Sequence, residues 1–257
     1  MTDADPNDFR AVFEATYNAP PSRVYEDVWR SVFGDEYPTG LDPHSFVTRS
    51  ELARFARDVR IGPGERLVDL GCGRGGAGLW VAAKTSAHLT GIDPAEAAIE
   101  AARARAAAMA MEASFQPGTF EATGLPDGDA DAVMSVDALL FTPDKAAALV
   151  ELRRVLRRGG RLVLTTWDYH TQPVGRPPQV PDHRPLLDRA DFRVLAYDDT
   201  PGWAETINRL DAGLMQRVDE LAAESGEPVE EVRRGLEEMH ATTACMIRRV
   251  FLVAEAA

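Results

Sequence analysis

Leu67-Val68-Asp69-Leu70-Gly71-Cys72-Gly73-Arg74-Gly75-Gly76 is the stretch that decides the fold of this 257-residue chain. An apolar run carries one acidic residue and then continues into glycines at alternate positions. The run predicts a buried strand, and residues 77–84 predict the helix that follows it. Glycines at such a turn let a ligand approach the backbone closely because no Cβ intervenes, and the start of the helix offers unpaired N–H groups. We therefore expect a ligand-binding turn here.

Predicted strands and helices alternate through the middle of the chain, which is typical of a parallel, doubly wound α/β sheet. Thr48 and Glu51 form a capping box that opens a helix ending near Val59. A later helix begins at Asp144 and stops at Gly159-Gly160, which predicts a glycine C-cap. The expected fold is a Rossmann-like, mostly parallel, seven-stranded sheet. Its strands are expected at residues 66–70, 88–93, 113–116, 131–136, 161–166, 192–197 and 246–254.

Four motifs occur in a fixed order along the chain. They are the glycine turn, Gly91-Ile92-Asp93-Pro94, Leu125-Pro126-Asp127 and the block at residues 151–162. In this order and spacing, residues 48–168 resemble class I S-adenosylmethionine (SAM)-dependent methyltransferases that act on small molecules, the type 11-like group. Arg158 stands where that family usually has proline. The resemblance therefore implies SAM as the cofactor.

The glycine spacing by itself fits a second cofactor class. Gly71, Gly73 and Gly76 also satisfy the dinucleotide fingerprint G-x-G-x-x-G, and Asp93 lies about 20 residues further on, where a ribose-binding acid belongs. Asp69 favours SAM, because dinucleotide-binding folds usually keep an apolar residue at that position. An NAD-linked oxidoreductase remains the less favoured alternative, and a glycine turn without a ligand is a third.

The resemblance implies a cofactor site at the carboxyl ends of the strands, where ligands bind in doubly wound sheets. Asp69 would orient the loop or hold the amino end of SAM through water, and Gly71 to Gly73 would pass beneath its methionine and ribose. Asp93 would accept both ribose hydroxyls, cap the next helix, or do both. The expected cofactor-binding residues are Asp69, Gly71, Cys72, Gly73, Gly75, Asp93, Pro94, Thr119, Phe120, Ser135 and Asp137.

The adenine end departs from the family pattern. Many relatives have an aspartate soon after the third strand, and Thr119 occupies the matching position. A threonine hydroxyl can still form the hydrogen bond, while Phe120 either stacks on the purine or packs in the core. Ser135 is expected to line the methionine end of the site through its backbone, and Asp137 is a candidate to face the reacting groups.

We expect a single methyltransferase domain over residues 1–257. Residues 1–47 would form an N-terminal helical cover, 48–168 the SAM-binding core, and 169–257 the remaining strands with a helical insertion at 203–240. Two aromatic sets recur every four residues, so each lies on one face of a helix. They either pack on the sheet or roof the pocket, and the two roles are compatible. The sets are Phe9, Phe13 and Tyr17, and Tyr25, Trp29 and Phe33.

Composition narrows the expected partners and location. A net charge of −13 disfavours binding to nucleic-acid phosphates. No apolar stretch reaches the ~18 residues of a membrane span, and the N-terminus lacks the apolar core of a signal peptide. The two cysteines form no disulfide framework, and the five histidines lack metal-ligand spacing. We expect a cytoplasmic protein without a metal, a small-molecule substrate, and neither nucleic acid nor membrane as a partner; monomer and homodimer both stay open.

These features predict an enzyme that transfers the methyl group of SAM to a small molecule by in-line displacement, with a bacterial secondary metabolite as the expected acceptor. The alternative is a SAM-binding protein of the same fold without methyl transfer, such as a repurposed cyclase or a regulatory binder. A general base is needed only if the acceptor is still protonated. The candidates for that role are Asp168 and His170, just beyond the fifth strand, with Tyr17 on the N-terminal aromatic face and Asp137 after the fourth strand as rivals.

Overall fold

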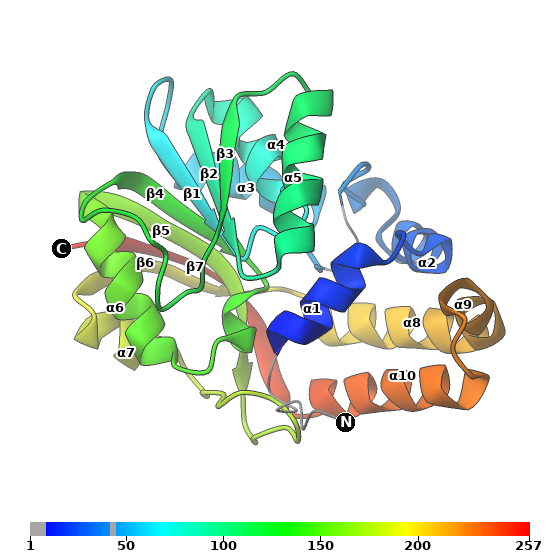
Figure 1. Cartoon of the computed structure of the whole chain (residues 1–257). Helices are drawn as coiled ribbons and strands as arrows, with labels where there is room; N and C mark the ends of the chain where they lie inside the picture. Colours follow the sequence, from blue (N-terminus) through cyan, green and yellow to red (C-terminus); the bar gives the residue numbers. More distant parts are fainter. Residues whose placement is uncertain (1–8, 42–44) are drawn as a thin grey trace.

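The glycine-rich turn connects strand β1 (Arg66–Leu70) to helix α4 (Gly76–Thr85), as its pattern predicts. The computed structural model describes residues 9–41 and 45–257, and the strands form one seven-stranded sheet in the order β3-β2-β1-β4-β5-β7-β6 (Figure 1). Strands β1 to β5 run parallel, and β7 lies antiparallel between β5 and β6. This confirms the expected Rossmann-like sheet. The remaining strands are β2 (His88–Asp93), β3 (Ala113–Pro117), β4 (Ala130–Val136), β5 (Leu156–Tyr169), β6 (Phe192–Asp199) and β7 (Met246–Ala256).

Helices pack on both faces of the sheet, which is why its central strands are apolar along most of their length. One face packs against α3 (Arg49–Asp58), α4 and α5 (Glu96–Ala108) through a core that includes Phe55, Leu79 and Ile99. The other face packs against α6 (Lys145–Val155) and α7 (Arg184–Arg189). Because β1 and β4 are neighbours, the order of the strands reverses between them, and the carboxyl ends of β1 and β4 border the expected ligand site.

Two expected boundaries are wrong. Helix α6 ends at Val155 and not at Arg158, because the buried Leu156 is extended and pairs with Ala130 of β4. The segment expected as one helix at 203–223 is two helices, α8 (Trp203–Gln216) and α9 (Val218–Ser225). The break at Arg217 lets Leu214 and Val218 enter the same apolar cluster.

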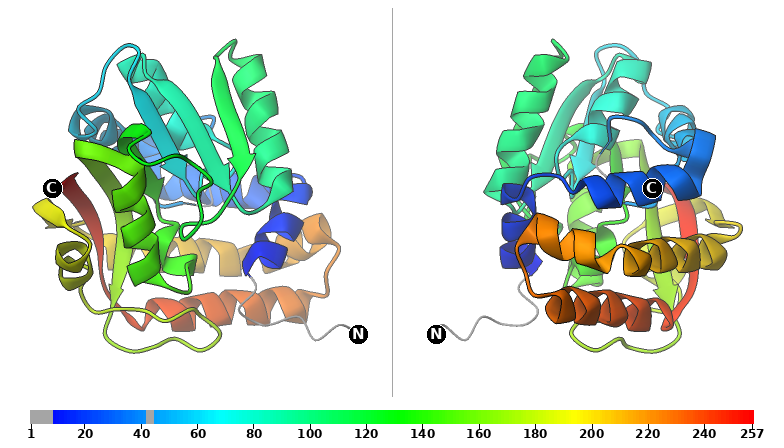
Figure 2. Two further views of the ribbon diagram at one scale, coloured as in Figure 1. Left: turned by 60° about the vertical axis from the view of Figure 1, so that its left-hand side comes forward. Right: turned by 90° about the vertical axis from the view of Figure 1, so that its right-hand side faces the viewer.

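The N-terminal helices and the insertion lie together, although about 200 residues separate them in the sequence. Helix α2 (Arg23–Phe33) packs on α8 closely enough that a Cβ on Gly213 would come within 2.8 Å of Val28. Figures 1 and 2 show α1 (Phe9–Asn18) between the sheet and the layer formed by α8, α9 and α10 (Val229–Thr243). A short 3₁₀ turn, η1 (Gly34–Glu36), follows α2. Within the described ranges, no helix has the length and apolar character needed to cross a bilayer.

Candidate functional site

The glycine turn adopts a backbone that side chains would obstruct. Gly71, Gly73 and Gly75 have φ values of 69°, 50° and 74°, in the left-handed region that favours glycine. A Cβ on Gly71 would overlap the Cβ of Ala138, and one on Gly73 would lie 2.7 Å from the Tyr17 hydroxyl oxygen. The turn therefore needs glycine at these positions for conformation and for space.

The amides of the turn are used within the protein. The N–H groups of Gly71 and Cys72 both donate to the Ile92 carbonyl, at 2.8 and 3.1 Å, and that of Gly75 donates to the Cys72 carbonyl. The Gly73 N–H donates to the Asp93 carboxylate at 2.9 Å. These four amides are therefore bonded within the protein, since the turn folds back on the end of β2. What the turn offers a ligand is close approach.

Asp93 connects three parts of the site. Its Oδ2 accepts the Gly73 amide, its Oδ1 accepts the Ala95 amide at 3.0 Å, and the residue borders a cavity. Burial raises the pKa of this carboxyl, and the nearby charge of Glu14 adds to the effect. Each carboxylate oxygen has a second lone pair. Asp93 can therefore order the turn and the start of α5 and still accept hydroxyl groups of a ligand.

Asp69 faces the start of helix α4 and lies outside the cavity lining. Its side chain is 2% exposed, and a Cβ on Gly78 would come within 2.5 Å of its Oδ2. Burial, opposed by the hydrogen bond from the Gly78 amide and assisted by the charge of Asp93, raises the pKa of Asp69 to about 7. In this position Asp69 orients the turn; a contact with cofactor through water stays a prediction.

A cavity of about 310 Å³ opens at the carboxyl ends of β1, β2 and β4. This volume is at the lower end of the range for small-molecule sites. Aromatic residues of α1 close it, and Phe141 of the short turn η2 (Leu139–Phe141) meets Phe9 and Phe13 with ring centroids 5.2 and 4.9 Å apart. Of the expected site residues, those that border the cavity are Tyr17, Gly71, Asp93, Pro94, Thr119, Phe120 and Asp137.

Four further expected residues do not border the cavity: Cys72, Gly73, Gly75 and Ser135. Cys72 is 8% exposed, and burial holds the pKa of its thiol well above the usual value, so the sulfur stays neutral. Ser135 is fully buried, and among the described residues its hydroxyl has no hydrogen-bond partner. Their cofactor contacts stay predictions.

A buried ion pair that the sequence did not predict holds the end of β4. Both carboxylate oxygens of Asp137 accept from Arg249 of β7, at 3.0 Å each, and Oδ2 also accepts the Phe46 amide. Arg249 is 1% exposed and also donates to Glu51 of α3. The only signal in the sequence is an arginine pair inside the otherwise apolar strand 246–254. Because Arg249 neutralises Asp137, this carboxylate positions the cavity wall.

The other three candidate bases, Asp168, His170 and Tyr17, lie in different surroundings. Asp168 is fully buried and binds the His183 Nδ1 at 2.9 Å, the Tyr197 hydroxyl at 2.7 Å and the Arg248 Nε at 2.8 Å. The exposed His170 forms a hydrogen bond to the Ala244 carbonyl. Tyr17 alone of the three borders the cavity, so the structure does not bring Asp168 and His170 to it.

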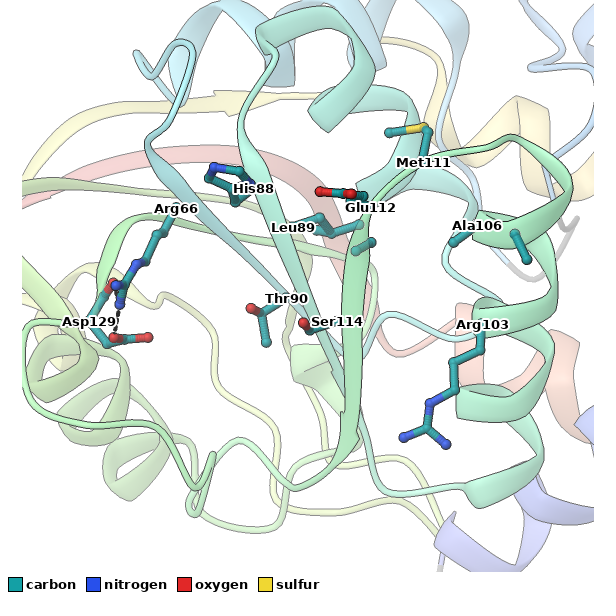
Figure 3. Close-up of a pocket in the computed structure, with 12 residues that line it drawn as sticks. Arg66, His88, Leu89, Thr90, Arg103, Ala106, Met111, Glu112, Ser114 and Asp129 are labelled. Carbon is teal, nitrogen blue, oxygen red and sulfur yellow. Dashed lines mark hydrogen bonds and ion pairs between the residues drawn. The ribbon is translucent and has the colours of Figure 1, made fainter.

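A wider hollow of about 610 Å³ lies at the opposite, amino end of β1, β2 and β3 (Figure 3). Arg66 and Asp129 form an ion pair at one side of it. Doubly wound sheets bind ligands at the carboxyl ends of their strands, so the smaller cavity is the candidate site. Within residues 9–41 and 45–257, no cluster of three or more His, Cys, Asp or Glu residues could hold a metal, and His44 lies outside the described residues.

Comparison with known proteins agrees with this geometry. Residues 68–164 match the methyltransferase domain family. Over 216 residues the chain is 29% identical to the chloroplastic tocopherol O-methyltransferase of Arabidopsis thaliana, which covers 74% of this chain. The chain spans only 60% of the length of that relative.

Solved structures share the fold over nearly the whole chain. The [4+2]-cyclase SpnF superposes with a TM-score of 0.73 and 19% identity, covering 98% of this chain and 97% of its own. The geranyl diphosphate C-methyltransferase of Streptomyces coelicolor, solved with Mg²⁺, geranyl diphosphate and S-adenosylhomocysteine, superposes with a TM-score of 0.66 and 15% identity. It covers 99% of this chain and 100% of its own. At such identities the likeness shows the fold.

Proposed function

Because the chain carries a class I methyltransferase domain whose cofactor is S-adenosylmethionine, we propose that it transfers the methyl group of SAM to a small-molecule acceptor. The observation that carries the proposal is the cavity at the carboxyl ends of β1, β2 and β4, where Gly71, Asp93 and Phe120 meet beneath α1. In this cavity Asp93 can accept the hydroxyl groups of a ribose, and aromatic side chains of α1 supply an apolar wall. Both features suit a cofactor that contains a ribose.

The residues present fit SAM. A Cβ at Gly71 would meet Ala138 and Phe120, which border the cavity. Asp93 would accept the ribose hydroxyls, and Thr119 and Phe120 would hold the adenine. When bound, SAM supplies a methyl group on a sulfonium, and this group is already electrophilic. The protein contributes alignment of the acceptor and exclusion of water.

General-base catalysis is required only for an acceptor that is protonated at the working pH. Among Asp168, His170 and Tyr17, Tyr17 alone borders the cavity. We therefore assign positioning to the cavity walls and keep Tyr17 as the base to test first. Asp137 is unsuited to the role because Arg249 occupies both of its oxygens.

We further propose a bacterial secondary metabolite as the acceptor, acted on in the cytoplasm by a single domain. Apolar and aromatic side chains dominate the α1 side of the cavity, and they favour an acceptor with an apolar body. The net charge of −13 argues against a nucleic-acid substrate.

Calorimetry with SAM, S-adenosylhomocysteine and NAD tests the cofactor, and release of S-adenosylhomocysteine with a panel of apolar acceptors tests turnover. We expect both SAM compounds to bind and NAD to give no heat. Gly73→Ala should weaken SAM binding at least about tenfold, because the new Cβ meets Tyr17 and the φ of 50° is strained. Gly235→Ala, at a helical glycine with open space, is the matched control.

Each alternative has its own signature in this experiment. Binding of NAD in preference to SAM would support an oxidoreductase. SAM binding without turnover on any acceptor would support a binder that does not transfer the methyl group. Unchanged SAM affinity in a folded Gly73→Ala variant would show that the glycine turn is not part of the SAM site.

A further inference from the structure

Arg176 lies on the loop that follows β5, beside the roof of the cavity. Its guanidinium carbon is 5.3 Å from the ring centroid of Phe9 and 5.8 Å from that of Phe141, and both rings border the cavity. The side chain is half-buried, and burial lowers its pKa. Among the residues that the structure describes, no carboxylate forms an ion pair with it and no side-chain hydrogen bond is made. Arg176 itself does not border the cavity, but it lies on two rings that do, and its five donors have no acceptor among the described side chains.

Tyr169 is a second donor without a partner. It ends β5 with 3% of its surface exposed, and its hydroxyl is buried without a hydrogen-bond partner in the described chain. Tyr169 belongs to the apolar cluster against which Phe141 packs, and Arg176 lies over the Phe141 ring, so both side chains are near Phe141. Burial raises the pKa of this phenol, and the charge of Arg176 counteracts part of the increase. At neutral pH the hydroxyl keeps its proton and can donate.

The charges around this pair do not satisfy it. Glu238 of α10 is exposed and acts on Arg176 only through its field. Asp137 acts on Tyr169 in the same way, while its own oxygens are bound to Arg249. A buried donor without an acceptor costs free energy, and a half-buried guanidinium beside aromatic rings has lost part of its hydration. One negatively charged oxygen group would satisfy both donors.

We infer that Arg176 and Tyr169 bind an oxyanion on the acceptor, a carboxylate or a phosphate, while the apolar body of the acceptor lies against Phe9 and Phe141. The guanidinium presents a planar fork that matches two oxygens of such a group. The inference rests on the proposed function and narrows its substrate class to acidic molecules with an apolar body.

The test measures binding to the protein saturated with S-adenosylhomocysteine. The probes are 4-phenylbutyrate, 4-phenylbutyl phosphate and the neutral 4-phenylbutyramide, which share one apolar body. Calorimetry on the wild type should show at least one anion binding tenfold or more tightly than the amide. Whichever anion binds more tightly identifies the group.

Three variants locate the anion. Arg176→Gln should abolish the preference for the anion and leave amide binding unchanged, Arg176→Lys should retain part of it, and Tyr169→Phe should reduce it severalfold. Arg189→Gln, at an exposed arginine that ends α7, is the matched control and should keep the full preference. Unchanged affinity for S-adenosylhomocysteine in each variant shows that the fold is intact.

Three results would overturn the inference: equal binding of acid and amide by the wild type, no binding of any probe, or a full preference in Arg176→Gln. Failure of the proposed function looks different: S-adenosylhomocysteine would not bind in the first step, or no acceptor would release it from SAM in the turnover assay.

Discussion

Arg249→Met should be among the most destabilising single changes in the sheet. Arg249 is 1% exposed and forms ion pairs with Asp137 and Glu51. Removing one partner of a buried pair leaves the other charge uncompensated, which costs about 3–5 kcal/mol. Since domains of this size unfold with about 5–15 kcal/mol, the variant should remain mostly folded but lose a large share of its stability.

Asp137→Asn should cost less, about 1–3 kcal/mol, because Arg249 keeps Glu51 as a counter-charge. In the double variant, the two effects should fall short of their sum by about 1–3 kcal/mol, as is usual for residues in direct contact. Affinity for S-adenosylhomocysteine should fall as well, since Asp137 borders the cavity and anchors the Phe46 amide.

Urea denaturation at pH 7 measures these free energies of unfolding. Arg193→Met is the matched control, because Arg193 pairs with Glu255 on the same sheet but is 65% exposed, and surface pairs contribute about 0–1 kcal/mol. Equal costs for Arg249→Met and Arg193→Met, or strictly additive effects in the double variant, would refute the reasoning.

Three further predictions concern the carboxylates and His170. Burial places the pKa of Asp69 at about 7, above the ~3.9 of an unfolded chain; the folded state therefore binds the proton more tightly, and stability is lost as the pH rises through 7. The free energy of unfolding of Asp69→Asn, measured by urea denaturation relative to that of the wild type, should thus rise by roughly 2–3 kcal/mol between pH 5 and pH 9. A difference between the two proteins that does not change with pH would mean that Asp69 titrates as in the unfolded chain. Asp93→Asn should weaken SAM binding by about 1–3 kcal/mol in calorimetry, whereas a loss within error would restrict Asp93 to ordering the turn. His170→Ala should keep a near-wild-type rate across pH because the side chain lies outside the cavity, and a drop of about 10²-fold at unchanged SAM affinity would instead establish it as the base.

The sequence predicted those parts of the fold that local signals specify. The bounds of β1 and β2 are confirmed, because an apolar run and the following glycine or proline define each strand within a few residues. The predicted end of α6 was wrong because Leu156 pairs in the sheet with Ala130, which lies 26 residues away in the sequence. Pairing across the sheet overrides the local glycine signal.

In the candidate site, too, local sequence signals predicted some residues, whereas contacts between distant residues were missed. Gly71 follows β1 and Asp93 ends the neighbouring β2, and both border the cavity because the carboxyl ends of adjacent parallel strands lie at one edge of the sheet. Arg249 was missed because its partner Asp137 is 112 residues distant and nothing in the intervening sequence connects them. Asp168 also lies near the end of a strand, but successive side chains of a strand point to opposite faces, and this one joins His183.

Helix α1 roofs the cavity and yet contributes no fully buried residue. Polar contacts hold it: the Glu14 carboxylate accepts the Ala97 amide, and Arg74 donates to the carbonyls of Tyr17 and Ala19. Docking of α1 and occupation of the cavity must therefore favour each other by the same free energy. The affinity for SAM then includes the cost of closing this roof. If release of the demethylated cofactor requires α1 to detach, the maximal rate should fall as the viscosity of the solvent rises.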